Sequence, residues 1–447
     1  MVIRPDLSAL LASTALAAAF ACAMLTGAMA HDHVVNRGRL VFADHEKPVV
    51  RVLDLDTGEV THSFDVPKPN PIFATAEDRR HVVIKTGDDA GTVRILDNGL
   101  TFESHGDHED VEKGEVKLLD LTFKGDRPAH VVSENDWLAV FYDGLRPWEA
   151  KSNAKAYLVP LDELGKAKPA VTEWQGPAPQ HGIAIPLDEK QWLISVTKPA
   201  YAKGDNQKVS SRPDGYEILD RTKNWAPIAS FNDTSDPAKS CKEFHGHASL
   251  ANTHVFGCNQ TIAGDERGDG GVLVIGQAAD GTWGSRKIAY PDERRSSTIK
   301  ARAGGQYMVA NYGLKSPYDA FLRIDPKAAS LSKADVFAVP DGQPTCQYEI
   351  SPDGRRVVNL TQDGKLRIYA IAPEWKEVAT FEAVGNFDCA YGAKTPVPSL
   401  AIVGDSAFVS DPENGRIREY LLNTLKQGLD IPVNGKPANL AGGGDAG

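Results

Sequence analysis

The sequence predicts an all-β protein that folds as a single β-propeller of about seven four-stranded blades. From residue 39 onward the chain lacks long helical periodicity and offers short β-rich runs, which Gly, Asp, Asn and Pro interrupt. Several segments also repeat one pattern, an apolar strand, an acidic turn and a second apolar strand. One sandwich could not absorb so many strands, whereas a ring of blades buries both faces of each sheet and leaves only short, protected edges.

Residues 1–30 have the features of a secretory signal peptide. Arg4 precedes a long run of small apolar residues, and the segment ends in Ala28-Met29-Ala30, a pattern that signal peptidase accepts. An uncleaved membrane anchor is the alternative use of such a segment. No later stretch is long and apolar enough to span a bilayer. We therefore expect a cleaved signal, no membrane insertion and a mature protein located in the periplasm.

The chain is acidic, with a formal net charge of −11 at pH 7. Removal of residues 1–30 takes away Arg4 and Asp6, so the net charge of the mature protein is unchanged. An acidic surface repels phosphate backbones and attracts cations. This charge argues against nucleic acid as a partner.

Four cysteines remain after Cys22 leaves with the signal. An even number of cysteines in an oxidising compartment predicts two disulfides, for which three connectivities exist. We favour Cys241–Cys258 and Cys346–Cys389, because the members of each pair lie close in sequence and a blade repeat can bring them together. Zinc–thiolate ligation is the competing use of cysteine, but the chain contains no C-x-x-C pair.

The strands can be followed in order along the chain. The segment DLDTGEV at 54–60 is typical of a hairpin, in which Asp-Thr-Gly supplies the tight turn. The repeated strand–turn–strand pattern is found in seven segments: 72–84, 130–143, 181–195, 245–258, 297–313, 348–371 and 400–422. We expect a flexible histidine-containing tail at 31–38, a propeller domain at 39–435 and a flexible Gly-rich tail at 436–447.

Three histidines stand at matching positions of consecutive repeats, each at the start of the first strand of a blade: His130, His181 and His245. In a propeller this strand lines the central channel, so we expect the three imidazoles to face one point near a channel mouth. Zinc binds imidazole nitrogen at about 2.0–2.1 Å, and three protein ligands leave a fourth position open. His247 lies on the same strand face as His245 and is a further candidate ligand, and Gly246 between them allows close backbone approach. Alternatively, each histidine only satisfies backbone groups or packs against a neighbouring blade.

The loop at 103–110, ESHGDHED, offers a second set of ligands in His105, Asp107 and His108. Its negative charge favours the imidazolium form, so protons would compete with metal at lower pH. We interpret the loop as a low-affinity or transfer site. A solvated charged loop is the ordinary alternative.

A third set of ligands arises from signal cleavage, which exposes His31, Asp32 and His33 at the new N-terminus. An α-amine, intervening amides and imidazoles can bind a metal ion and pass it on by ligand exchange. The alternative is an accidental cleavage junction. The other histidines of the strands are expected to have ordinary structural roles: His45, His62, His81 and His254.

Taken together, these motifs resemble those of the AztD-type periplasmic zinc chaperones, which accompany bacterial zinc ABC uptake systems. The resemblance rests on the signal peptide, the His-Asp-His mature start, the acidic His-Gly-Asp-His loop and the channel histidines on a cysteine-bearing propeller. It covers the whole mature chain and implies that Zn(II) is held on the propeller and handed to a periplasmic zinc solute-binding protein. We expect a monomeric chaperone without catalytic residues. The resemblance does not settle which histidines form the high-affinity site.

Two other functions are compatible with the same residues. An open zinc position can bind water and lower its pKa toward ~7, and Glu243 or Asp107 could then act as the general base of a hydrolase or lactonase. No recognised catalytic signature supports this function. The second alternative is a metal-independent propeller that binds protein partners on one face.

Overall fold

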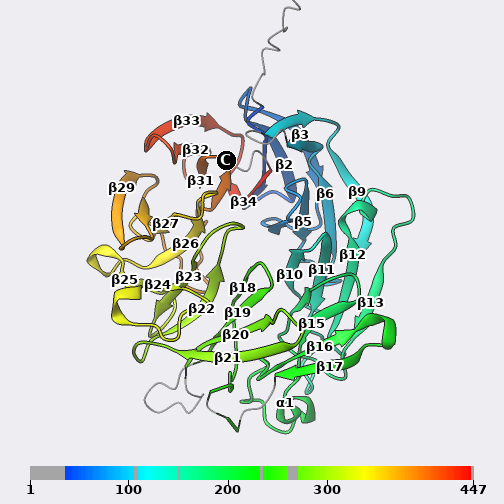
Figure 1. Ribbon diagram of the computed structural model, residues 1–447. Coiled ribbons are helices and arrows are strands. Elements are labelled where there is room, and N and C mark those ends of the chain that lie inside the picture. Colours follow the sequence, from blue (N-terminus) through cyan, green and yellow to red (C-terminus); the bar gives the residue numbers. More distant parts are fainter. Residues whose placement is uncertain are drawn as a thin grey trace, which may run out of the picture. The chain divides into compact units, whose positions relative to one another are not determined.

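The computed structural model describes residues 36–104, 109–149, 152–231, 235–236, 238–259 and 270–443. These residues form eight four-stranded sheets and one two-stranded hairpin, which confirms the predicted all-β propeller. The only α-helix in these ranges is α1 (Pro199–Lys203), a short turn between two strands of one sheet. Figure 1 shows the sheets following one another around a ring in chain order.

Each four-stranded sheet is one blade. Blade 1 contains β34 (Pro437–Gly443), β1 (Arg39–Asp44), β2 (Val49–Asp54) and β3 (Glu59–Asp65). Blade 2 contains β4 (Ile72–Thr75), β5 (His81–Lys85), β6 (Val93–Asp97) and β9 (Lys117–Phe123). The hairpin of β7 (Leu100–Ser104) and β8 (Glu109–Lys113) is inserted between β6 and β9.

The next three blades follow the chain without insertions of further strands. Blade 3 contains β10 (Pro128–Glu134), β11 (Trp137–Tyr142), β12 (Lys155–Pro160) and β13 (Thr172–Gln175). Blade 4 contains β14 (Ala184–Pro186), β15 (Gln191–Ser195), β16 (Tyr216–Asp220) and β17 (Ala226–Phe231). Blade 5 contains β18 (His247–Leu250), β19 (Thr253–Cys258), β20 (Gly271–Gln277) and β21 (Trp283–Ala289).

The last three blades have the same order of strands. Blade 6 contains β22 (Arg295–Lys300), β23 (Met308–Gly313), β24 (Ala320–Ile324) and β25 (Val336–Ala338). Blade 7 contains β26 (Thr345–Ile350), β27 (Arg356–Thr361), β28 (Lys365–Ala370) and β29 (Lys376–Glu382). Blade 8 contains β30 (Leu400–Val403), β31 (Ser406–Asp411), β32 (Arg416–Leu421) and β33 (Lys426–Pro432).

The first strand of each blade lies toward the centre of the ring. First strands of neighbouring blades contact one another, as β10 contacts β14, β18 contacts β22 and β34 contacts β4. In a propeller these strands run in the same direction. We call the face at which they begin the upper face, and the face at which tight turns join the first and second strands the lower face.

Apolar side chains between neighbouring blades form the core and close the ring. Val83 of β5 packs with Leu138 and Val140 of β11, and Phe408 of β31 packs with Phe42 of β1, which joins the last blade to the first. An apolar cluster of this kind fills each junction between consecutive blades. Inner strands are therefore buried on both faces, and their sequences, such as WLAVFY in β11, are continuously apolar rather than alternating.

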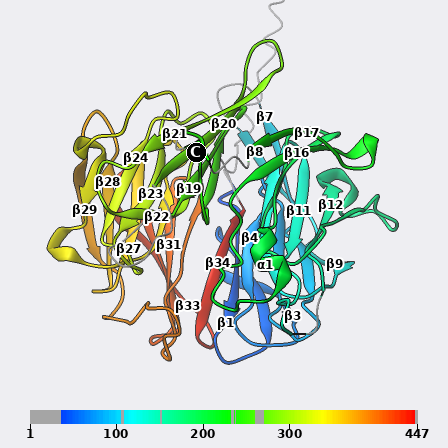
Figure 2. The same cartoon turned by 90° about the horizontal axis from the view of Figure 1, so that it is seen from below.

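The number of blades differs from the sequence prediction, because the described residues form eight blades instead of about seven. The seven repeat segments correspond to blades 2 to 8. Blade 1 has no contiguous repeat, since its first strand comes from the C-terminus and its other three from the start of the domain. The two ends pair from Arg39↔Gly443 to Asp44↔Pro437. Figure 2 shows β34 beside β1.

The prediction of a flexible tail at 436–447 is wrong over most of its length, because Pro437–Gly443 forms β34. The glycines of this segment reflect close packing. A Cβ atom on Gly442 would collide with Val403, and one on Gly443 would collide with Asn98. The propeller therefore extends beyond residue 435, while the predicted signal peptide, the residues 31–35 and the residues 444–447 lie outside the described ranges.

Both predicted disulfides are present. The Cα atoms of Cys241 and Cys258 are 4.8 Å apart, and those of Cys346 and Cys389 are 5.6 Å apart. The first disulfide joins the segment that leads into β18 to the end of β19. It therefore braces the part of the chain that carries His245.

Removal of the first disulfide by the double substitution Cys241→Ala/Cys258→Ala is expected to lower the free energy of unfolding by about 3 kcal/mol. The cross-link spans a sequence separation of 17 residues and restricts the unfolded chain. Urea denaturation of the oxidised protein measures this loss, with Cys346→Ala/Cys389→Ala as the matched variant for the other disulfide. A midpoint equal to that of the wild type would contradict the expectation.

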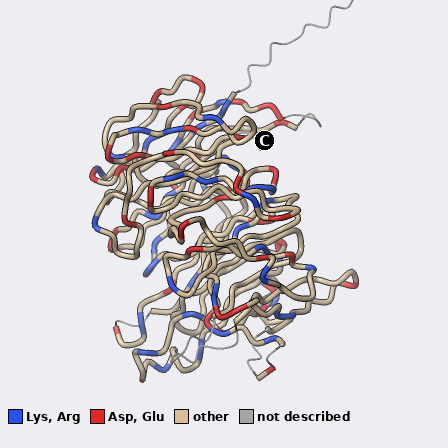
Figure 3. The backbone as a smooth tube through the Cα atoms, turned by 90° about the vertical axis from the view of Figure 1, so that its left-hand side faces the viewer, with Lys and Arg blue, Asp and Glu red and all other residues tan. Residues whose placement is uncertain are grey.

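Charged residues of both signs are interspersed along the backbone in the view of Figure 3. The net charge of −11 therefore does not come from a single acidic segment on this side of the protein. Among the residues that the structure describes, no helix has the length and hydropathy needed to cross a membrane.

Candidate metal centre

Three of the predicted ligands converge at the upper face. His130 is the third residue of β10, whereas His181 and His245 lie just before β14 and β18. The Nε2 atoms of His130 and His181 are 3.4 Å apart, and the ring centroid of His245 lies 5.9 Å from that of His130 and 5.5 Å from that of His181. One nitrogen from each ring lies within 4.8 Å of the others. We call these three residues the triad.

Hydrogen bonds at the Nδ1 atoms orient two rings of the triad. His181 Nδ1 lies 2.8 Å from Asp143 Oδ2, and His245 Nδ1 lies 2.6 Å from the carbonyl oxygen of Ser297. A carboxylate and a carbonyl can only accept, so Nδ1 donates in both rings and Nε2 keeps a lone pair for a metal ion. In the described part of the chain, Nδ1 of His130 has no such acceptor.

Electrostatics favour the neutral imidazole at two members of the triad, His130 and His245. Burial, together with its neighbours His181 and His245, holds the pKa of His130 well below its ordinary value. Burial and the nearby Arg212 guanidinium lower the pKa of His245 to about 4. Neutral rings bind metal without first losing a proton. His130 and His245 can therefore bind a cation at neutral pH without first losing a proton.

The triad lines a cavity of about 220 Å³ at the upper face. Its other walls are largely apolar and include Ile183, Tyr216 and Phe244. The side chain of His181 is 27% exposed, so solvent or an incoming ligand can reach the triad. A metal ion here would have three imidazole ligands and one position open to exchange.

The backbone of a neighbouring strand approaches Gly246 closely, as its position between His245 and His247 predicts. It has a φ of +84°, and a Cβ atom placed on it would lie 2.7 Å from the carbonyl oxygen of Ser297, the oxygen that orients His245. A side chain at this position must therefore displace the strand that orients the ligand.

We expect Gly246→Ala to weaken zinc binding at the triad by about tenfold, because the second shell of a zinc ligand contributes on that scale. Competition with a chromophoric zinc chelator measures the affinity. Gly281→Ala is the matched control, since Gly281 also has a positive φ but a Cβ atom added to it would meet no atom within 4 Å. Equal affinities of the two variants would contradict the expectation.

His247 does not join the triad, although it lines the same cavity. It forms a second cluster with His254 and Glu134. His247 Nε2 lies 3.4 Å from His254 Nδ1, and the carboxylate of Glu134 lies 3.9 Å from the Nδ1 atoms of both rings. The sequence pattern groups His247 with His245, whereas the structure assigns it to this separate group, which we call the second cluster.

The second cluster includes two residues that sequence reasoning missed. The sequence pattern predicts an ordinary structural role for His254 and does not single out Glu134. In the β18–β19 hairpin Ser249 pairs with His254, so His254 is the diagonal neighbour of His247 on one sheet face. Glu134 lies four residues after His130 along β10, which places both on the same side of the strand. The diagonal position of His254 relative to His247, and the interval of four residues from His130 to Glu134, were the sequence features that could have indicated the second cluster.

Burial dominates the electrostatics of the second cluster. It raises the pKa of Glu134 to about 7, lowers the pKa of His254 to about 4 and holds the pKa of His247 well below its ordinary value. Ser249 Oγ donates to Glu134. A carboxylate and two neutral imidazoles provide one negative charge and two nitrogen donors, a ligand set that Zn²⁺ accepts.

Some of the remaining candidates lie outside the described residues, and the others have partners that explain their positions. His31, Asp32, His33, His105, Asp107 and His108 lie outside the described residues. Glu243, the candidate general base of a hydrolase, is instead paired with Lys198 at 3.1 Å and accepts a hydrogen bond from Asn259. His81 lies 2.6 Å from Asp78 in a turn, and His45 bonds the carbonyl oxygen of Val397, as expected for structural histidines.

The chain is similar to the zinc chaperone AztD of Citrobacter koseri, with 26% identity over 423 residues, or 93% of this chain and 89% of the relative. The crystal structure of Citrobacter koseri AztD superposes with a TM-score of 0.73 at 25% identity and covers 90% of this chain and 96% of the other. The structure of the apo form gives a TM-score of 0.72 at 24% identity, with the same coverage. No family model matches the sequence. The resemblance predicted from the histidine motifs is thus confirmed by a relative that is named as a chaperone rather than as an enzyme.

Proposed function

We propose that this protein is a periplasmic zinc chaperone, which binds Zn(II) through histidines of the propeller and delivers it to the solute-binding protein of a zinc ABC transporter. The observation that carries the proposal is the convergence of His130, His181 and His245, from three consecutive blades, on one accessible point. The similarity to a zinc chaperone over nearly the whole chain supports the same function.

The geometry of the triad suits a cargo that must be released. A closed cage of four protein ligands would retain zinc, whereas three ligands leave a position at which an incoming histidine of the partner can bind first. The old ligands then leave one at a time, and no free ion is released. His130 is the ligand that we expect to leave first, because only the other two rings have an acceptor on Nδ1.

The second cluster is proposed as a further zinc site of the propeller. Its two imidazoles and the carboxylate of Glu134 form a three-ligand set of different charge from the triad. Because an anionic ligand offsets part of the metal charge, the two sites are expected to differ in affinity and exchange rate. We therefore expect the mature protein to bind two zinc ions on the propeller.

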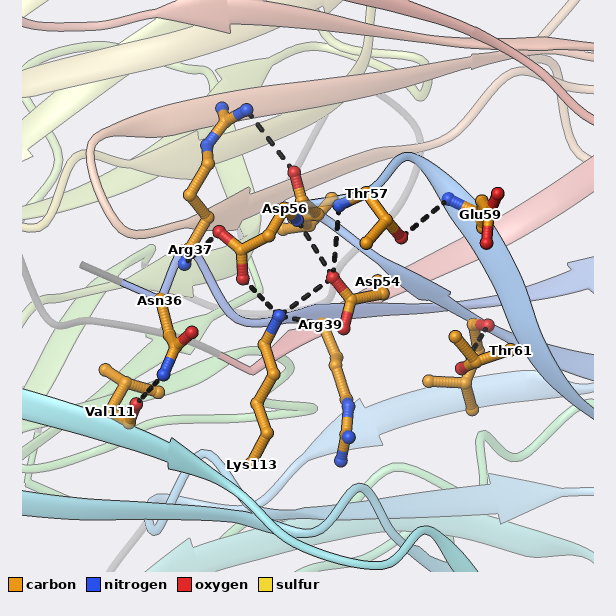
Figure 4. Close-up of polar contacts among 12 residues, drawn as sticks. Asn36, Arg37, Arg39, Asp54, Asp56, Thr57, Glu59, Thr61, Val111 and Lys113 are labelled. Carbon is orange, nitrogen blue, oxygen red and sulfur yellow. Dashed lines mark hydrogen bonds and ion pairs between the residues drawn. The ribbon is translucent and has the colours of Figure 1, made fainter. Parts of the chain in front are cut away.

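The N-terminal histidines and the loop histidines are proposed as transfer ligands, and described residues beside both sets lie close together. Asn36 Nδ2 donates to the carbonyl oxygen of Val111 in β8 over 2.6 Å, as Figure 4 shows. Lys113 of β8 bonds Asp54 at 2.8 Å and also bonds Asp56, which fixes the hairpin against blade 1. His31 and His33 precede Asn36, and His105 and His108 lie between β7 and β8. Both sets therefore connect to the same edge of the propeller.

A periplasmic location is proposed from the predicted signal peptide and from the two disulfides, which persist in an oxidising compartment. A monomeric state is proposed because the ring closes on itself through β34 and β1.

Zinc titration of the mature protein tests the function. We expect two bound ions, and on mixing with a purified zinc solute-binding protein of the same organism we expect direct transfer that is faster than release to a chelator. Variants that lack His31 and His33, or His105 and His108, should keep propeller affinity and transfer more slowly. The absence of zinc binding below micromolar concentrations would overturn the proposal in favour of a metal-independent propeller.

A further inference from the structure

The second cluster lies between two separate hollows of the propeller. His247 lines the upper cavity that contains the triad. His254 does not line that cavity and instead forms part of a crevice of about 90 Å³. Because His247 Nε2 and His254 Nδ1 are 3.4 Å apart, a cation held between them borders the cavity through one ring and the crevice through the other.

The crevice belongs to the lower face. It is lined by residues of three turns that join first and second strands: Asn135 after β10, Asp188 after β14 and Asn252 after β18. The triad, by contrast, stands at the beginning of the first strands, on the upper face. The two hollows therefore approach the second cluster from opposite ends of blades 3 to 5.

The lining of the crevice suits a hydrated cation. Asn135, Asn252, Gln191 and Gln277 supply amide oxygens and Asp188 supplies a carboxylate, and the volume of about 90 Å³ is large enough for several water molecules. Glu134, the residue before Asn135, keeps 25% of its side chain exposed. The crevice thus meets the cluster at His254, whereas Glu134 does not itself line it, and the His247 and His254 side chains are only 8% and 3% exposed.

We propose that this crevice is a second metal opening of the propeller, through which a hydrated divalent cation reaches or leaves the second cluster without passing the triad. The inference rests on the proposed zinc-binding function. It follows that the two clusters exchange metal through opposite faces, so that one can be loaded while the other is occupied by a partner.

Asn252 offers a direct way to close the opening. It lies in the exposed β18–β19 turn at the rim of the crevice, and its side chain makes no hydrogen bond within the described residues. Asn252→Trp adds bulk at the rim without removing a ligand. Asp405→Trp is the matched control, because it places the same ring in the equivalent exposed turn of blade 8.

Cobalt(II) can be followed at this site by tryptophan fluorescence. The Trp283 ring lies 6.4 Å from that of His254 and lines the crevice, so cobalt bound to the second cluster should quench its emission. The same binding experiment with Trp283→Phe identifies this signal among the seven tryptophans of the chain.

Stopped-flow mixing of the mature protein with cobalt(II) gives the decisive comparison. We expect Asn252→Trp to slow Trp283 quenching by on the order of tenfold, with unchanged cobalt stoichiometry, whereas Asp405→Trp behaves as the wild type. A His130→Ala/His181→Ala variant should still load the second cluster at the wild-type rate. The proposed opening would be refuted if Trp283 were quenched in Asn252→Trp at the wild-type rate. It would also be refuted if a folded His130→Ala/His181→Ala variant lost the quenching. Failure of the wild type to bind any metal would instead refute the proposed function.

Discussion

Replacing His130 by alanine is expected to weaken zinc binding at the triad by at least about 100-fold. Apparent binding energies of structural zinc sites are about 10–16 kcal/mol, so one of three or four ligands accounts for roughly 3 kcal/mol. Each 1.4 kcal/mol corresponds to about tenfold in the dissociation constant. Zinc titration by competition with chelators of graded affinity measures the change, and one high-affinity ion should be lost from the stoichiometry.

The control for this prediction is His62→Ala, which removes a partly exposed histidine of β3 and should leave zinc affinity unchanged. His247→Ala should weaken only the second site, because its ring belongs to the other cluster. If His130→Ala bound zinc as tightly as His62→Ala, the triad would not be a zinc site, and the convergence of its rings would be a matter of packing.

Loss of the Asp143 carboxylate is expected to have the second largest effect. Asp143 is buried, accepts from His181 Nδ1 at 2.8 Å and does not contact the proposed ion position. It holds the imidazole in the tautomer that presents Nε2 and increases the basicity of that nitrogen. We expect Asp143→Ala to weaken zinc binding by about 10–100-fold and Asp143→Asn to lose less, because an amide oxygen can still accept from Nδ1.

A spectroscopic measurement separates this positioning role from general destabilisation. Cobalt(II) in the triad should give a visible absorption band that shifts in Asp143→Asn, where the ligand field of His181 changes while the fold persists. Thermal unfolding of the metal-free proteins serves as the reference for stability. An unchanged spectrum and affinity in Asp143→Ala would show that His181 is oriented by packing alone.

The propeller could be predicted from sequence because its repeats are local. Each of blades 2 to 8 is a contiguous run of strand and turn, so the pattern of 181–195 or 348–371 is visible without knowledge of the fold. Blade 1 depends on pairing between Arg39–Asp44 and Pro437–Gly443, and no local pattern reports contacts between the two ends of a chain. For the same reason the glycines of β34 suggested flexibility, although they are required by close contact with neighbouring blades.

The metal-binding residues, too, could be predicted from the sequence only in part. His130, His181 and His245 lie at or near the start of the first strand in three consecutive repeats, so their convergence could be expected from the symmetry of the ring. The second cluster has no such symmetry, because His247 and His254 meet across one hairpin and Glu134 comes from another blade. Asp143 was also missed, since it lies beyond the end of β11 and reaches His181 from the neighbouring blade. Contacts of this kind depend on side-chain direction and cannot be read from spacing alone.

The pairing of β34 with β1 also makes closure of the ring depend on residues 437–443, which follow every other strand in the chain. Without that segment, blade 1 lacks its innermost strand and β1 presents an unpaired edge. A chain truncated before Pro437 would retain all six proposed propeller ligands yet expose β1 and the apolar side chains on both sides of blade 1. Blade 1 is therefore completed by residues 437–443, and closure of the ring does not depend on any of the proposed metal ligands.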